Sequence, residues 1–408
     1  MAQKQDSIYF DYAASTPVSL GVLAAMQPYF SNEFANPNAV HAQGERAQAA
    51  LDKARKCIAD LCAVDFASVI FTASATETNN LMLRGIVKQW RKTHAKAKPH
   101  IVTTLIEHAS VLDTCKDMEQ GGEADVSYAK PGPDGIVSVP EIMKLVRPDT
   151  ICVSVMAVNN VTGAIQPVAQ LARAIRELRE EKLKQARHAL QDAIYPAFHA
   201  DAAQAAYATP DALALGGLSA DFMTLCGHKI YGPKGAAALI MRMKAMPGQK
   251  LVAPLITGGD QEFGFQSGTQ NVPAIIGFAK ALLSAQESRK IEHARLAKLK
   301  DLFLKQVMDI YPKAVCNSPE ESVPGIVNVS FPGMHYDELL YRFDKAGIAI
   351  SVGSACHARL VEPSHVLKAM DVGDGRLESA IRFSFGKYTD EKQIYEAAKR
   401  MRAHLAAS

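Results

Sequence analysis

The sequence lacks the features that mark several large classes of protein. None of its apolar runs approaches the roughly 20 residues of a membrane-spanning helix, and stretches such as 151–158 are interrupted by polar residues. Neither sign of charge dominates, because 45 Lys and Arg residues stand against 42 Asp and Glu residues, so we expect no nucleic-acid-coating role and no direct nucleic-acid partner. No apolar segment follows basic residues near the start, which favours a cytoplasmic protein.

Cysteine is sparse and unpaired. The seven cysteines form no CxxC pair and fit neither a disulfide framework nor a zinc ribbon, so we expect no metal site. Most of them are expected to be small buried apolar residues. Cys356 differs, because residues 351–359 are small, polar and include a glycine, which is typical of an exposed loop. We therefore expect Cys356 to be the reactive cysteine.

Common nucleotide and metal motifs are missing as well. The chain has no GxGxxG and no HExxH, and residues 227–234 depart from the phosphate-loop pattern because Pro233 replaces its lysine. Nicotinamide redox chemistry, P-loop hydrolysis and zinc proteolysis therefore lose support.

The composition is that of an ordinary globular protein, with 48% hydrophobic residues. The chain has 408 residues, which is long enough for two or three domains. Short apolar runs alternate with helical stretches, as in an α/β protein with a mainly parallel sheet. The predicted strands are 69–71, 100–104, 151–155, 197–201, 221–225, 236–241, 325–331, 348–352 and 381–385, and the predicted helices are 76–94, 109–120, 167–190, 203–215 and those within 273–308. We expect a large domain over residues 16–262 and a smaller α+β domain from residues 1–15 and 263–408, with a ligand cleft between them.

Polar residues follow several predicted strands, where open α/β sheets bind ligands. Backbone N–H groups at Ala75 and Thr76, with the Thr76 hydroxyl, can hold a phosphate at the start of a helix, although simple capping explains the same residues. Asp201 ends a buried strand and needs a cation, such as a protonated pyridine nitrogen, unless it is a helix cap. The amine of Lys229 can bond to an aldehyde cofactor, or it is one more surface lysine. A phosphate cradle, an acid and an amine are together what pyridoxal phosphate needs.

Two further residues suit such a site. His108 begins a helix after a strand, where an imidazole can stack on a cofactor ring and move protons; a core histidine is the alternative. Arg382 lies between apolar residues of a strand, and its fork of donors suits the carboxylate of an amino acid, whereas a structural salt bridge explains it equally well.

At these residues the chain resembles the cysteine desulfurases of the class V aminotransferase family, in particular the group with a long cysteine-bearing loop that serves iron–sulfur cluster assembly. The resemblance covers nearly the whole chain, and the order and spacing of its short pieces are specific. The matching segments are 9–17, 36–41, 75–79, 107–108, 159–160, 199–204, 227–235, 267–269, 353–356, 362–364 and 381–384. The resemblance implies a pyridoxal-phosphate-dependent fold of the aspartate-aminotransferase type and a homodimer.

The resemblance also implies roles for the site residues. Lys229 would hold the cofactor, with Asp201 at its pyridine nitrogen and His108 stacked over its ring. The implied hydrogen-bond partners of its phenolic oxygen are Gln204 and Asn160, and those of its phosphate are Ala75, Thr76, Cys226, His228 and, from the other subunit, Thr269.

Substrate roles follow from the same resemblance. Arg382, with Asn36 and Asn160, would hold the carboxylate of L-cysteine. Cys356 would be the nucleophile that takes the substrate sulfur as a persulfide, releases L-alanine and passes the sulfur to an acceptor such as an iron–sulfur scaffold protein.

Several positions depart from the family pattern. Ala157 and Val161 replace a usual His and Glu, Cys226 replaces a phosphate-binding Ser, and Gln266 stands where Arg is typical. The loop continues beyond Cys356 without the usual Ser or Thr, and residues 182–196 form a longer segment than usual. We expect these changes to spare the core chemistry and to affect the rate, the phosphate affinity and the choice of acceptor.

Two alternatives to a cysteine desulfurase stay open at this point. The first is a selenocysteine lyase or an aminotransferase of the same family, in which Cys356 is incidental. The second is a partner-binding protein that kept the fold and lost turnover, for which Cys226 and Gln266 are the sequence support.

Overall fold

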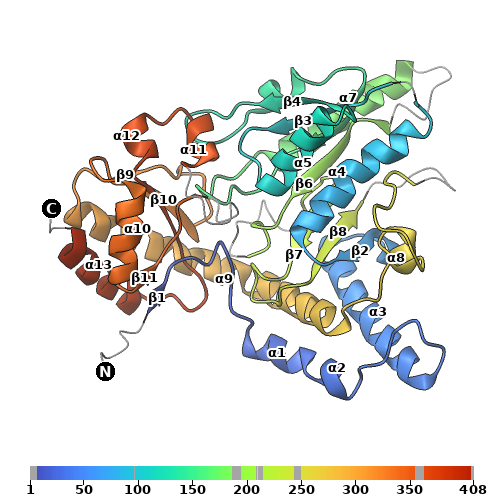
Figure 1. Cartoon of the computed structure of the whole chain (residues 1–408), viewed down its shortest axis with the longest axis horizontal. Coiled ribbons are helices and arrows are strands. Elements are labelled where there is room, and N and C mark those ends of the chain that lie inside the picture. Colours follow the sequence, from blue (N-terminus) through green and yellow to red (C-terminus); the bar gives the residue numbers. More distant parts are fainter. Residues whose placement is uncertain are drawn as a thin grey trace.

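The computed structural model describes residues 7–95, 97–185, 194–207, 209, 215–242, 250–353 and 363–405 (Figure 1). Cys356 and the loop predicted around it lie outside these residues.

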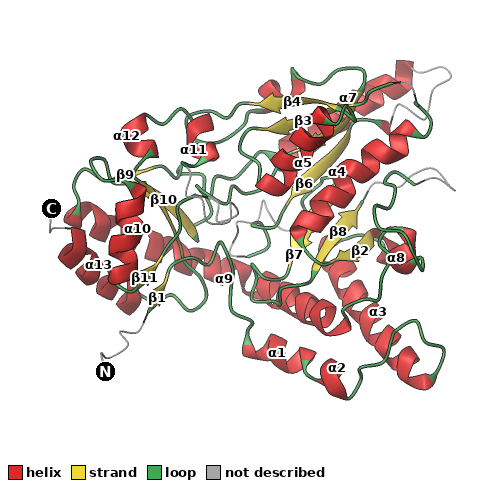
Figure 2. Ribbon diagram, viewed as in Figure 1, coloured by secondary structure: helices red, strands yellow, loops and turns green. Residues whose placement is uncertain are grey.

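The larger part of the molecule is built around a seven-stranded sheet (Figure 2). The strands in spatial order are β2 (Val69–Thr72), β8 (Ala237–Met241), β7 (Phe222–Cys226), β6 (Ala197–Asp201), β5 (Thr150–Ser154), β3 (His100–Thr104) and β4 (Asp125–Ala129). β8 runs antiparallel to both of its neighbours, and every other neighbouring pair is parallel. The carboxyl ends of the parallel strands therefore share one edge of the sheet.

Helices cover both faces of this sheet. The helices before residue 262 are α1 (Leu20–Met26), α2 (Pro28–Ser31), α3 (Ala42–Cys62), α4 (Ala75–Arg91), α5 (Ala109–Gln120), α6 (Val139–Met143), α7 (Val168–Gln185) and α8 (Gln261–Gly264), with a 3₁₀ turn η1 (Phe66–Ser68). Alternate strand residues point to opposite faces. In β2, Ile70 packs into the cluster beneath α4 and α5, whereas Val69 and Phe71 pack into the cluster beneath α3 and α7.

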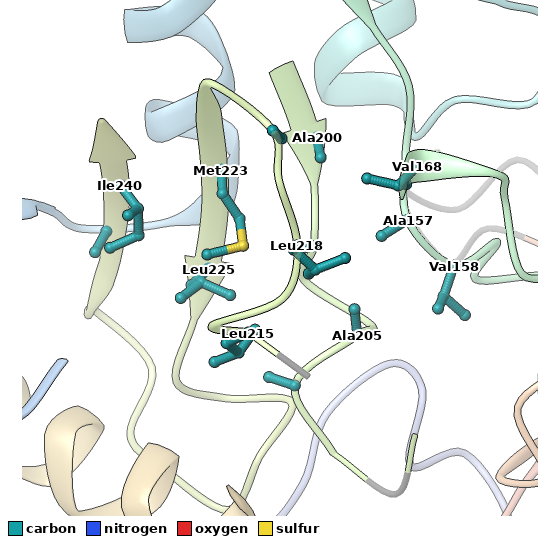
Figure 3. Close-up of a cluster of buried hydrophobic side chains, with 14 of the residues drawn as sticks. Ala157, Val158, Val168, Ala200, Ala205, Leu215, Leu218, Met223, Leu225 and Ile240 are labelled. Atoms are coloured by element: carbon teal, nitrogen blue, oxygen red, sulfur yellow. The ribbon is translucent and has the colours of Figure 1, made fainter. Parts of the chain in front are cut away.

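Figure 3 shows part of the second cluster, in which side chains from strands and loops meet at the centre of the large part. Met223, Leu225 and Ile240 project from β7 and β8 toward Leu215 and Leu218. All five side chains are buried. This packing fixes the positions of the strand ends that carry the polar residues described below.

The smaller part combines the two ends of the chain. β1 (Ile8–Tyr9) pairs in parallel with β11 (Ile348–Ala349), and an antiparallel sheet joins β12 (Ala380–Ser384), β10 (Ile326–Ser330) and β9 (Val315–Cys316). Its helices are α10 (Tyr336–Lys345), α11 (His365–Ala369), α12 (Asp374–Leu377) and α13 (Glu391–Leu405). The 39-residue helix α9 (Val272–Ile310) runs beneath both parts (Figure 1).

The structure confirms the α/β class and places strands at each of the nine predicted positions, within a few residues of the predicted bounds. It also contains β1, β4 and β9, which the sequence did not predict. The helix predicted over 203–215 is wrong for residues 203–207, which form turns, because the Asp201 carboxylate accepts a hydrogen bond from the backbone of Ala203. The boundaries 16–262 and 263–408 stay a prediction.

Candidate active site

A cavity of about 280 Å³ lies at the carboxyl ends of the parallel strands, next to the N-terminal segment and β12. It brings together residues that lie more than 300 positions apart in the sequence. Nine of the predicted site residues line it: Ala75, Thr76, His108, Asn160, Asp201, Gln204, His228, Lys229 and Arg382.

The amino end of α4 forms one wall of the cavity. The Ser74 hydroxyl accepts a hydrogen bond from the Glu77 N–H at 3.1 Å, so Ser74 caps the helix. Ala75 and Thr76 are the first helical residues and face the cavity. Capping and anion binding are therefore compatible here, because the cap uses one orphan N–H group and the positive end of the helix remains directed at the cavity.

Asp201 is 5% exposed at the end of β6. Its carboxylate accepts hydrogen bonds from the Asn79 side chain at 2.9 Å and from the Ala203 N–H at 3.0 Å. None of the described lysines and arginines forms an ion pair with it. A buried carboxylate that opens onto a cavity and has only neutral donors is arranged to receive a cationic ligand group.

Lys229 and His228 follow β7 and face the same cavity. The Thr16 N–H and hydroxyl both donate to the His228 carbonyl, at 2.8 and 2.9 Å, which ties this turn to the N-terminal segment. Burial, with Lys229 and Lys234 close by, lowers the pKa of His228 to about 4. His228 is therefore neutral at pH 7 and can donate one ring N–H to an anion.

His108 caps α5, and its Nδ1 accepts a hydrogen bond from the Ser110 N–H at 3.1 Å. Burial lowers the pKa of His108, and the charge of Lys229 adds to this effect. The neutral ring then carries its proton on Nε2. The preceding residue, Glu107, is fully buried and accepts hydrogen bonds on Oε1 from the Thr104 hydroxyl and the Met156 N–H, both at 2.8 Å.

Arg382 is 2% exposed, yet it reaches the cavity. Its Nη2 donates to Asp11 Oδ1 at 2.7 Å and its Nη1 donates to the Asn160 carbonyl at 2.9 Å. Its Nε is buried and has no hydrogen-bond partner. The salt bridge considered for this arginine thus exists, and the same side chain also lines the cavity.

Three of the predicted site residues that the structure describes do not line the cavity. Cys226 is buried behind it, in a small cluster with Ala75 and Ala203, and burial raises the pKa of its thiol to about 12. Thr269 lines a separate cavity of about 150 Å³. Asn36 is exposed and its side chain accepts a hydrogen bond from the Asn38 N–H, and Cys356 lies outside the described residues.

Sequence reasoning gave no role to several residues that the fold brings to the site. Met156, Val158 and Ala203 line the cavity, Asn79 holds Asp201, and Asp11 pairs with Arg382. Asn79 offered a usable signal, because it lies one helical turn after Ala75 and therefore faces the same side as the start of the helix. Asp11 offered none, since its pairing depends on long-range folding.

These residues fit pyridoxal phosphate. The acid that would face its ring nitrogen pairs with none of the lysines and arginines that the structure describes. The amine that would bond its aldehyde lies in the same cavity, and a helix terminus with a neutral histidine suits its phosphate. No helix among the described residues is long and apolar enough to cross a membrane.

Comparisons with known proteins agree with this geometry. Residues 8–396 match the family model described as aminotransferase class-V. The curated protein "Cysteine desulfurase, mitosomal" of Encephalitozoon cuniculi is 38% identical over 392 residues, which cover 95% of this chain and 84% of the relative.

Two solved structures share the fold. "NIFS-LIKE PROTEIN" superposes with a TM-score of 0.85 at 33% identity and covers 98% of this chain and 99% of its own. "SspA in complex with cysteine" has a TM-score of 0.76 at 32% identity and covers 94% of this chain and all of its own (100%).

Proposed function

The chain belongs to the class V aminotransferase family and resembles its cysteine desulfurases over nearly its whole length, and on this premise we propose that it is a pyridoxal-phosphate-dependent cysteine desulfurase. It converts L-cysteine to L-alanine and retains the sulfur as a persulfide of its own cysteine. The observation that carries the proposal is the meeting of Lys229, Asp201 and Arg382 around one cavity.

Pyridoxal phosphate would supply an electron sink for the substrate when bound. Lys229 would hold it through its aldehyde, and Asp201 would keep its ring nitrogen protonated. The Asn79 hydrogen bond at 2.9 Å fixes the Asp201 carboxylate for this contact. Ala75, Thr76 and neutral His228 bind the phosphate through N–H and O–H donors.

Arg382 orients the substrate. A guanidinium binds a carboxylate through its N–H donors, and Arg382 lines the cavity. Val158, Met156 and Ala203 give this part of the cavity apolar walls. These walls limit the access of water to a substrate that Arg382 holds by its carboxylate.

His108 lines the same cavity and is the imidazole proposed to move protons there. The Ser110 N–H holds Nδ1 as an acceptor, so Nε2 carries the proton of the neutral ring and is its hydrogen-bond donor. Because burial and Lys229 lower its pKa, an imidazolium that has taken up a proton releases it readily at pH 7.

Cys356 performs the sulfur transfer. Its thiolate attacks the substrate sulfur, a sulfur–sulfur bond forms, and the substrate carbon–sulfur bond breaks. The electron pair of the broken bond stays on the substrate carbon, which takes up a proton and leaves as L-alanine. The substrate sulfur is oxidised to the persulfide level while the substrate carbon is reduced by the same electron pair, so the transfer needs no added oxidant or reductant.

The partners follow from this chemistry. L-cysteine is the substrate, and "SspA in complex with cysteine" supports it. A protein with a reactive thiol, such as an iron–sulfur scaffold, accepts the persulfide sulfur. The homodimer accounts for Thr269 and Asn36, which lie away from the cavity of their own chain and would be brought to it by a second subunit. The cytoplasmic location stays a prediction, because one relative is named as mitosomal.

The direct test is a single-turnover reaction analysed by mass spectrometry. The cofactor-loaded protein is mixed with L-cysteine and digested without reductant. The proposal predicts one added sulfur atom on the peptide that contains Cys356, released by thiol treatment, together with an equal amount of L-alanine. A selenocysteine lyase or an aminotransferase would leave this peptide unchanged, and a catalytically silent homologue would form no alanine.

A further inference from the structure

Asp11 and Arg382 form a buried ion pair whose two members come from opposite ends of the chain. The Oδ1–Nη2 distance is 2.7 Å, and the side chains are 18% and 2% exposed. Arg382 has no other carboxylate partner among the described residues. Because an isolated buried guanidinium is costly, Asp11 is its resident counter-ion.

The backbone fixes Asp11 in this position. Asp11 forms an isolated parallel bridge with Ser384 of β12, and its carbonyl accepts the N–H of Ala14 at 3.0 Å. Arg382 is held equally firmly, since its N–H and carbonyl pair with Ser351. These backbone hydrogen bonds hold both residues in place, so their side chains start from positions that bring the two charges together.

An incoming carboxylate therefore meets a guanidinium that is already paired with the carboxylate of Asp11. The second carboxylate gains the Arg382 charge but is repelled by the charge of Asp11, so its net attraction is smaller than that of an unpaired arginine. The same reasoning applies to the substrate and to the product, because both carry the α-carboxylate.

We propose that Asp11 is a positioning and affinity-tuning residue that competes with the carboxylate of bound amino acids for Arg382. The inference rests on the proposed function, in which Arg382 holds that carboxylate. Its benefit is release: a site that holds L-alanine less tightly empties sooner, while the arginine stays ordered and charge-balanced between turnovers.

Asp11→Asn isolates the charge. An amide oxygen still accepts from Nη2, so the geometry is kept and only the negative charge is lost. The empty protein should become less stable, because Arg382 loses its counter-ion, and carboxylates should bind more tightly, because they then supply it. A merely structural residue would lower stability without raising affinity.

The experiment measures dissociation constants by calorimetry in the cofactor-loaded protein with two probes, L-alanine and propionate, which lacks the amine. Asp11→Asn should bind both roughly 3- to 10-fold more tightly than the unsubstituted protein, and its unfolding temperature should fall. Asp11→Glu should restore the original affinity. Asp11→Ser replaces Asp11→Asn if the asparagine variant does not fold.

The matched control is Asp221→Asn. Asp221 forms a comparably buried pair with Arg179, with side chains 14% and 15% exposed, at the opposite ends of the strands. This variant should lose stability without any change in affinity.

Equal or weaker binding of propionate by Asp11→Asn overturns the proposal, as does failure of propionate to bind the unsubstituted protein. Absence of alanine formation from L-cysteine counts instead against the proposed function, since propionate binding needs no turnover.

Discussion

Removal of the Glu262 carboxylate should destabilise the large part of the molecule more than any surface change. Glu262 and Arg55 form a bidentate ion pair with distances of 2.7 and 2.8 Å, and their side chains are 2% and 4% exposed. The same carboxylate accepts hydrogen bonds from the Phe71 N–H at 2.9 Å and from the side-chain amide of Gln270 at 3.2 Å. It thus joins α3, β2 and the loop that leads to Thr269.

The magnitude follows from what Glu262→Ala leaves behind. Arg55 would keep its charge in a buried site, against the rings of Phe71 and Phe263, without a counter-ion. Breaking such a pair costs about 3–5 kcal/mol. Glu262 has a φ of 52°, and alanine adopts this left-handed conformation no more easily, so no relief of strain offsets the loss. For a domain of this size the unfolding temperature should fall by about 10 °C.

Differential scanning calorimetry of the cofactor-free protein tests this value. Glu33→Ala is the control, because Glu33 and Arg46 pair at 2.9 Å with side chains 33% and 54% exposed, and its loss should cost under about 1 kcal/mol. Arg55→Leu combined with Glu262→Leu should recover most of the stability lost in Glu262→Ala. A shift for Glu262→Ala no larger than that of Glu33→Ala would refute the reasoning.

Three further outcomes are expected. Burial raises the pKa of Glu107 to about 8, so the folded protein holds a proton that the unfolded chain releases near pH 4.5, and the free energy of unfolding should fall as the pH rises from about 5 to 8. In Glu107→Gln the unfolding temperature should depend less on pH over that interval. An unchanged pH dependence in this variant would disprove the raised pKa of Glu107. Cys226 lies buried behind the cavity, so Cys226→Ser should leave the rate of cofactor loss during dialysis unchanged, measured by visible absorbance, and a slower loss would show that residue 226 reaches the phosphate. Asn79→Ala should weaken cofactor binding roughly 10-fold through loss of the hydrogen bond to Asp201, and unaltered binding would remove Asn79 from the site.

The sequence was most informative where local pattern and burial agree. The strands 100–104 and 197–201 have the bounds that their short runs of mostly apolar or β-branched residues predicted, because both lie inside the sheet and are buried on both faces. β4 was missed because it is an edge strand whose residues are mostly half-buried, so its polar residues hid the pattern. The turn after Asp201 was missed because a side-chain hydrogen bond replaced the helix that the alanines favoured.

In the candidate site, too, residues placed by local sequence pattern could be predicted and residues placed by long-range folding could not. Residues at strand ends, such as Asp201 and Lys229, could be found from their positions in the pattern, since parallel strands bring their carboxyl ends to one edge. The Asp11–Arg382 pair could not, because it joins residues 371 positions apart and depends on how β12 meets the N-terminal segment. Thr269 lines a separate cavity of its own chain, and its contribution from a second subunit stays a prediction.

The most direct test of the central claim is the amount of L-alanine formed from L-cysteine, with a thiol reductant present, by the cofactor-loaded protein and by Cys356→Ala under the same conditions. A desulfurase that uses Cys356 as its nucleophile predicts steady alanine formation by the first and nearly none by the second, with the same cofactor content in both. Equal rates in the two proteins would contradict the assignment of Cys356 as the sulfur acceptor.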